Sequence, residues 1–129
     1  MLSSKEIEEL VSIRDKEKNN LELKSIRIIT EPSGKKDQAK QLAYGMVGLA
    51  NKNGGRLILG VNDDGAFDGK FLGNTDDIKE YIHNICRDKI SPIIEFEIHF
   101  IESASWDVFL IYIPKRRNIP HAYIMESIS

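Results

Sequence analysis

The chain has 129 residues, and its 18 Lys and Arg against 20 Asp and Glu give a formal net charge of −2. This length fits one domain with a core of its own, and the near-zero charge excludes a protein that holds nucleic acid by bulk positive charge. A single cysteine excludes an internal disulfide framework, and the chain shows neither a long apolar run nor an N-terminal apolar signal segment. We therefore expect a soluble cytoplasmic protein without a membrane partner.

The spacing of apolar residues predicts alternating helices and strands. Helices are indicated where apolar residues recur every three or four positions, and strands where they alternate or form short runs. The clearest helical pattern runs from Ala39 to Ala50, and Asn53-Gly54-Gly55 ends it because glycine adopts the left-handed conformation without a Cβ clash. In chain order we expect a helix over 4–16, a strand over 20–30, a helix around 39–50, a strand over 56–61, a helix over 75–89, and strands over 94–100 and 106–113. This order predicts a single domain of the α/β (α+β) class over 1–129.

The sequence lacks the motifs of several common catalytic and cofactor sites. It contains no Walker-type phosphate loop, no serine-hydrolase elbow and no zinc-protease motif. His83, His99 and His121 stand at no spacing to Cys86 that would suit zinc, so we expect no zinc site. Cys86 lies on the apolar face of its predicted helix and is most simply a small buried hydrophobic residue.

A group of carboxylates and one lysine carry the remaining chemistry. Glu17 follows the first predicted helix, and Glu22 and Lys24 share one face of the first predicted strand. Asp63 follows the strand over 56–61, at the end where open α/β sheets usually bind ligands. If the two strands are neighbours, these carboxylates can hold Mg²⁺ or Mn²⁺, which polarises a phosphodiester and activates water, while Lys24 stabilises developing negative charge. From spacing alone, however, a helix-end charge, an exposed strand pair and a turn rich in Asp explain the same residues more simply.

Basic residues gather in two parts of the chain. One part is the segment 14–40, and the other follows the last predicted strand. Each charge run is most simply a solvated face, and the two become a nucleic-acid contact only if they meet in space. The candidate phosphate-binding residues are Arg27, Lys35, Lys36, Lys115, Arg116 and Arg117.

Five segments match, in order along the chain, the motifs of a known family. They are Leu21-Glu22-Leu23-Lys24 (L-E-[FL]-K), Gly48 to Gly55 (A-F-A-N-x-x-G-G), Gly60 to Gly65 (G-V-D-D-D-G), Ile90-Ser91-Pro92 (I-x-P), and Ile111 to Pro114 followed by Ile119-Pro120-His121 (a late strand and a Pro-containing loop). Together they resemble the Schlafen AlbA-like domain family over about 17–123, with Leu49 in place of the usual phenylalanine.

The resemblance implies a fold, a function and a set of residues. It implies a mixed β-sheet flanked by helices, with nucleic-acid binding as the general property. In the Schlafen branch it implies a metal-dependent endoribonuclease that acts on structured RNA such as tRNA. That branch uses two glutamates five residues apart and an aspartate in the G-V-x-D turn, and Glu17, Glu22 and Asp63 match this pattern as ligands of Mg²⁺ or Mn²⁺.

The chain also departs from the family. It lacks the cysteines of the Schlafen zinc site, and it has one of the two lobes that form a groove in eukaryotic Schlafens, so we expect a homodimer. The sequence stops before the family's usual Y-x-R-x-G strand, so we expect the domain to lack its last strand. Two other functions stay open: a non-catalytic DNA- or RNA-binding module of a transcriptional regulator and, more weakly, an ATP- or nucleotide-binding domain. The sequence indicates no preference between DNA and RNA.

Overall fold

The computed structural model describes residues 2–13, 16, 18–30, 35–115 and 120–124, and the side chains of all of these except 35–37. Helices and strands follow one another as α1 (Ser4–Val11), β1 (Leu21–Lys24), α2 (Arg27–Thr30), α3 (Lys35–Asn51), β2 (Gly55–Leu59), α4 (Thr75–Lys89), β3 (Ile90–Ser91), β4 (Glu97–Glu102), β5 (Asp107–Ile113) and β6 (Ala122–Tyr123). Within these ranges no helix is long and apolar enough to cross a membrane.

The main sheet has four strands in the order β1-β2-β5-β4. β1 runs parallel to β2, with Glu22 opposite Leu57 and Lys24 opposite Leu59, whereas β5 is antiparallel to both β2 and β4. The parallel pair is joined by a crossover that contains α2 and α3, as a parallel connection requires. The predicted single α/β domain with a mixed sheet is confirmed, and the first two strands are neighbours, which the predicted carboxylate cluster requires.

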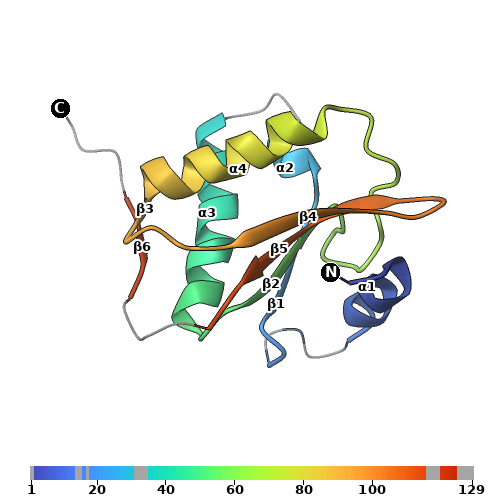
Figure 1. The fold of residues 1–129 in the computed structure, drawn as a ribbon, viewed down its shortest axis with the longest axis horizontal. Coiled ribbons are helices and arrows are strands. Elements are labelled where there is room, and N and C mark those ends of the chain that lie inside the picture. The colour runs from blue at the N-terminus through green and yellow to red at the C-terminus, as the bar shows by residue number, and fades with distance from the viewer. Residues whose placement is uncertain (1, 14–15, 17, 31–34, 116–119, 125–129) are drawn as a thin grey trace.

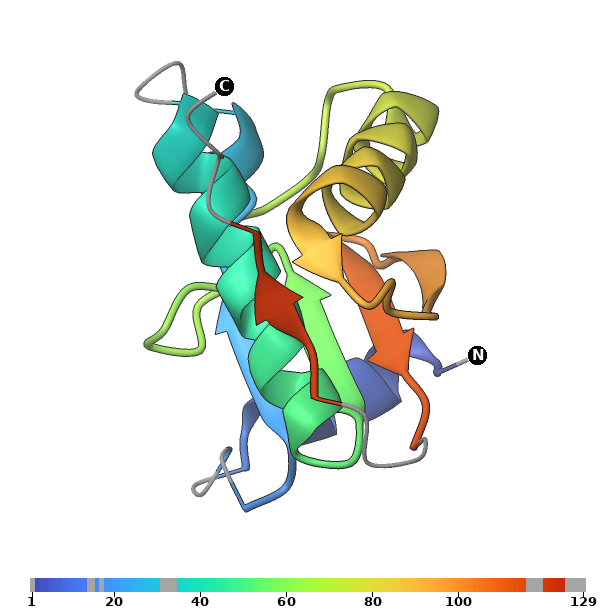
Figure 2. The same cartoon turned by 90° about the vertical axis from the view of Figure 1, so that its left-hand side faces the viewer.

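Helices cover both faces of this sheet: α3 and α4 lie on one face and α1 lies on the other. α3 and α4 pack on one face, where the core includes Leu57, Phe109 and Ile111. The intervening residues of the same strands point to the other face, where α1 packs through Ile7 and Val11. Figure 1 shows α1 on the opposite side of the sheet from α3 and α4, and Figure 2 shows β6 lying alongside α3.

The predicted strand over 20–30 is wrong in its second half. β1 ends at Lys24, and the short helix α2 follows. The carboxylate of Asp68 accepts hydrogen bonds from the Ser25 hydroxyl at 3.0 Å and from the Ile26 N–H at 2.8 Å, and these bonds hold the chain where it leaves the sheet. The isoleucines that suggested a strand pack instead against the core beneath α3 and α4.

Other element bounds differ less from the prediction. The first helix ends at Val11 and not at residue 16, and its capping box is confirmed by hydrogen bonds between Ser3 and Glu6 in both directions. α4 has the predicted bounds, with the Asn74 side chain accepting hydrogen bonds from the first turn. The paired strands β3 and β6 were not predicted, because two-residue strands leave no alternation to detect.

The turn after α3 brings the chain close to two other segments. Asn53, and not a glycine, takes the first left-handed position, with φ of 72°. Gly54 and Gly55 follow with φ of 89° and 153°, and an added Cβ would lie 2.4 Å from the Ile113 carbonyl oxygen at Gly54 and 2.2 Å from the Asn20 carbonyl oxygen at Gly55. The two glycines are therefore required by close backbone approach as well as by conformation.

Candidate functional site

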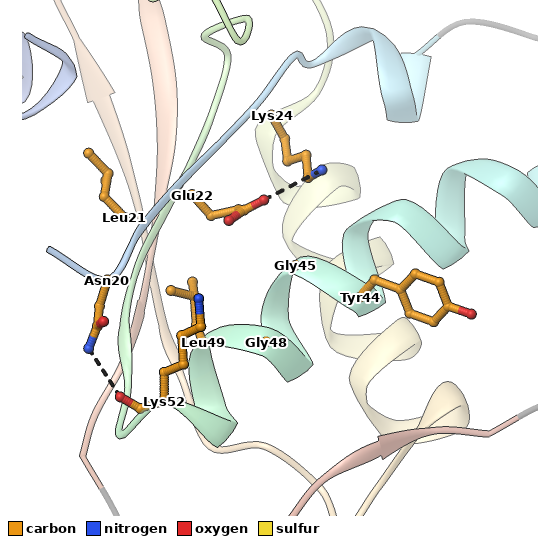
Figure 3. A pocket seen from close by; sticks show the side chains of 9 residues that line it. All are labelled: Asn20, Leu21, Glu22, Lys24, Tyr44, Gly45, Gly48, Leu49 and Lys52. Atoms are coloured by element: carbon orange, nitrogen blue, oxygen red, sulfur yellow. Dashed lines mark hydrogen bonds and ion pairs between the residues drawn. The ribbon is translucent and has the colours of Figure 1, made fainter. Parts of the chain in front are cut away.

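A small pocket lies between β1 and α3, with a volume of about 150 Å³. Glu22 and Lys24 enter it from the same face of β1, and Lys24 Nζ lies 3.7 Å from Glu22 Oε1 (Figure 3). The Lys24 side chain is 24% exposed and the Glu22 side chain 40%. The nine lining residues are Asn20, Leu21, Glu22, Lys24, Tyr44, Gly45, Gly48, Leu49 and Lys52. The predicted shared face of Glu22 and Lys24 is confirmed, and both side chains are accessible to a ligand.

Two glycines on α3 shape the opposite wall of this pocket. Gly45 is buried, and a Cβ added there would lie 3.0 Å from Leu57 Cδ1 and 3.6 Å from both Glu22 Cγ and Lys24 Cε. At Gly48 an added Cβ would meet no atom within 4 Å. Glycine at position 45 therefore lets α3 approach the sheet, and glycine at position 48 leaves the mouth of the pocket open. Glycine in a helix interior costs about 1 kcal/mol relative to alanine, so this opening is made at the expense of helix stability.

The structure places Asp63 in a turn that follows β2 at the end of the β1–β2 pair. The N–H groups of Gly60 and Val61 donate to the Lys24 carbonyl oxygen at 2.8 and 3.3 Å, which fixes the start of this turn next to the end of β1. The Asn62 side chain accepts two backbone N–H groups within the turn, at 3.0 Å each, and leaves the Asp63 side chain exposed. Asp63 therefore lies at the end of the β1–β2 pair where the sequence predicts it.

The three-ligand metal site of Glu17, Glu22 and Asp63 stays a prediction. Glu17 lies outside the described residues. In the part of the chain that the structure describes, no three His, Cys, Asp or Glu side chains come close enough together to hold a metal ion. Carboxylate oxygens are the donors that Mg²⁺ and Mn²⁺ prefer, so the chemistry of Glu22 and Asp63 fits such an ion.

The predicted basic residues lie at different places along α3. Lys35 and Lys36 begin α3, and the Lys115 backbone lies against Gly54, just beyond the other end of α3. A 17-residue helix is about 25 Å long, so these two basic segments do not meet at one point. Instead they stand at the two ends of the helix whose middle lines the Glu22 pocket.

Of the other predicted basic residues, the structure describes only some. Arg27 is exposed on α2, which contacts α3. The side chains of Lys35 and Lys36 are outside the described ones, and Arg116 and Arg117 lie outside the described residues altogether. Lys52, which lies in neither basic segment of the sequence, adds a basic group to the pocket lining.

Three residues from separate motifs of the sequence meet at the C-terminal end of α3. The Asn51 side chain donates to the His121 carbonyl oxygen at 3.1 Å and accepts from the His121 N–H at 2.8 Å. His121 Nδ1 lies 2.6 Å from the Pro92 carbonyl oxygen. These contacts hold the segment that carries β6 against α3. The sequence motifs marked all three residues, but nothing in the sequence showed that they join.

A larger pocket, of about 560 Å³, lies between α2, α4 and the loop that precedes α4. Two of its acids already have partners: Asp107, 5% exposed, accepts from Lys70 Nζ and from the Phe71 N–H, and Asp68 accepts from Ser25. These contacts hold the loop in place. The β1–α3 pocket, where Glu22 and Lys24 are accessible, is therefore the stronger candidate site.

Comparisons with known proteins agree with this fold. The sequence profile of the family described as Schlafen, AlbA_2 matches residues 11–128. The N-terminal domain of an ATP-dependent DNA helicase RecG-related protein from Nitrosomonas europaea is similar over 99% of this chain and 84% of that chain, with a TM-score of 0.66 and 18% identity. The DIP2311 protein from Corynebacterium diphtheriae is similar over 87% of this chain and 21% of that chain, with a TM-score of 0.55 and 19% identity. No curated protein matches significantly.

Proposed function

Because the chain belongs to the Schlafen AlbA_2 family, we propose that it binds nucleic acid and acts as a metal-dependent endoribonuclease on structured RNA such as tRNA. The observation that carries the proposal is the Glu22–Lys24 pair in an open pocket whose lining also includes Lys52. The pocket therefore presents the cations of Lys24 and Lys52 to a phosphate, with the Glu22 carboxylate beside them.

The carboxylate mildly favours a nuclease over a simple binding surface. A carboxylate beside a phosphate backbone repels it unless a cation lies between them. Glu22, with Glu17 and Asp63, would hold Mg²⁺ or Mn²⁺, and the bound ion would supply Lewis acidity and an activated water. Lys24, 3.7 Å from Glu22, would stabilise the negative charge that develops on the phosphate.

Incubation of the protein with tRNA, with Mn²⁺ or with EDTA, tests this activity. We expect cleavage in Mn²⁺ only, its loss in Glu22→Gln with RNA binding retained, and a loss of about 100-fold in Lys24→Gln. Glu102→Gln, at an exposed acid on β4 away from the pocket, is the matched control and should cleave normally. Cleavage that persists in EDTA would refute the metal dependence, and cleavage that persists in Glu22→Gln would refute the role of Glu22.

A non-catalytic binding module is the second candidate function. It is favoured by the name of the similar Nitrosomonas europaea protein, which refers to a DNA helicase. Such a module would bind duplex DNA with an affinity that falls with salt, because each phosphate contact contributes about −0.9 to the log–log slope on B-DNA. The triple variant Lys115/Arg116/Arg117→Ala should reduce this slope, and an unchanged slope would show that these residues do not contact phosphate.

We also propose that two copies act together, because the resemblance to eukaryotic Schlafens implies a groove between two such lobes and this chain has one lobe. Light scattering after size exclusion should then give twice the monomer mass. A species of only 14.7 kDa at the concentrations used for binding would contradict the homodimer.

A further inference from the structure

Tyr44 exposes an aromatic ring at the rim of the Glu22–Lys24 pocket. It lines this pocket, yet the residue is 53% exposed. Figure 3 shows the ring projecting from α3 on the side away from β1. Its neighbours Leu42, Ala43 and Met46 are buried in the core, so the tyrosine lies on the outer side of the helix.

Two neighbours set the position of this ring. Lys40, one turn earlier on α3, places Nζ 5.4 Å from the ring centroid. Tyr123 of β6 meets the ring edge-on, with the centroids 5.3 Å apart and the planes at 78°. β6 is itself held by pairing with β3 and by the Asn51–His121 hydrogen bonds. The ring is therefore oriented before any ligand arrives, which lowers the entropic cost of using it.

The charges around Tyr44 suit a polyanion that carries aromatic groups. Lys40 lies over the ring, and Lys24 and Lys52 line the pocket that begins beside it. Single-stranded nucleic acid is recognised by this combination, in which cations follow the phosphates and aromatic rings stack on bases. A base inside a duplex is already stacked on its neighbours, so this contact needs an unpaired base.

We propose that Tyr44 stacks on one unpaired base of a single-stranded or looped RNA whose phosphates pass Lys40 and Lys24. This inference rests on the proposed function and names its substrate class: RNA with at least one unstacked nucleotide at the cleavage pocket. Because Tyr44 and Lys24 line the same pocket, a base held on Tyr44 would position a phosphate of the same strand at Lys24, and Tyr44 is in this sense a positioning residue. Stacking on one aromatic side chain changes affinity by about 5- to 150-fold, and a ring that is half exposed belongs near the lower end.

Fluorescence anisotropy with a labelled single-stranded RNA oligomer tests the proposal. Tyr44→Leu should weaken binding about 10-fold with an unchanged salt slope, because no phosphate contact is lost, and Tyr44→Phe should bind normally. Tyr112→Leu is the matched control. Tyr112 is 36% exposed with Arg56 5.6 Å from its ring, but it lies on the α1 face of the sheet, and this variant should bind normally.

An abasic oligomer of equal length and charge separates the stacking from the electrostatics. The wild-type protein should bind it about 10-fold more weakly than the base-bearing oligomer, a comparison that no folding defect can disturb. Tyr44→Leu should bind both oligomers alike. Equal wild-type affinity for the two oligomers, or a Tyr44→Leu affinity equal to wild type, would overturn the stacking role while leaving the proposed function intact. If the wild type binds neither RNA nor DNA at low salt, the proposed function and this inference fall together.

Discussion

Alanine at the two glycines of the pocket wall should have opposite effects on stability. Gly45 and Gly48 are three residues apart in α3, and alanine at either position gains about 1 kcal/mol of helix propensity. At Gly48 nothing opposes this gain, because an added Cβ meets no atom within 4 Å. At Gly45 the Cβ would lie 3.0 Å from Leu57 Cδ1, and Leu57 is fully buried and cannot move aside freely.

The expected magnitudes follow from these contacts. Overpacking a tight core typically costs about 1–3 kcal/mol, so Gly45→Ala should be destabilised by up to about 2 kcal/mol after the propensity gain. Gly48→Ala should be stabilised by about 1 kcal/mol. For a chain of 129 residues, about 1 kcal/mol corresponds to about 4 °C in Tm, so the two variants should differ by about 4 to 12 °C.

Thermal unfolding followed by circular dichroism measures both variants against the wild type. RNA affinity gives a second readout, because the Cβ at Gly45 would also lie 3.6 Å from Glu22 Cγ and Lys24 Cε and would narrow the pocket. Equal stabilisation of the two variants would refute the close packing of α3 on β2. A loss of stability in Gly48→Ala would refute the open mouth of the pocket.

Three further predictions concern stability and reactivity. Burial raises the pKa of the Cys86 thiol from 9.0 to about 12, so the native protein should resist a thiol reagent at pH 8 and react only when unfolded. Because the unfolded thiol ionises first, the stability of the protein should fall as the pH rises above about 9. Rapid labelling of the native protein would contradict this burial. Asp107→Ala should lower the free energy of unfolding in urea by about 2–3 kcal/mol, because the Phe71 N–H loses its charged acceptor. Asp88→Ala, at an exposed ion pair, should leave the urea midpoint unchanged. Equal effects of the two variants would contradict the buried role of Asp107. Asn51→Ala should accelerate hydrogen exchange in β6 with little change in Tm, and unchanged exchange would show that the hydrogen bonds to His121 do not hold this strand.

Elements were predictable where several local signals agreed. α4 has an N-cap at Asn74, acids in its first turn and a buried stripe that includes Ile82 and Cys86, so every signal indicated one helix. The shared face of Glu22 and Lys24 followed from the two-residue period of a strand, and the parallel neighbour was then enough to place Asp63 at the same end.

Other features depend on contacts between distant segments. The isoleucines of 26–29 fit a strand until Asp68, 42 residues after Ile26, binds the backbone there and the chain turns into α2. Tyr44 gave no signal because its exposure depends on which face of α3 meets β1. The predicted metal site also depends on contacts between distant segments, because its three proposed ligands come from separate parts of the chain.

The contact between Asn51 and His121 has a practical consequence for shortening the chain. A version cut after Ile113 would keep every strand of the main sheet, although it would lose β6, the partner of β3. It would thereby lose Tyr123, which contacts Tyr44, and with it the partner that orients the proposed base-stacking ring. Such a version would also lose the proposed phosphate contacts Lys115, Arg116 and Arg117, so it should bind RNA poorly, and its failure would say nothing about the Glu22 pocket. The smallest unit worth assaying therefore ends after β6, well beyond the end of the main sheet.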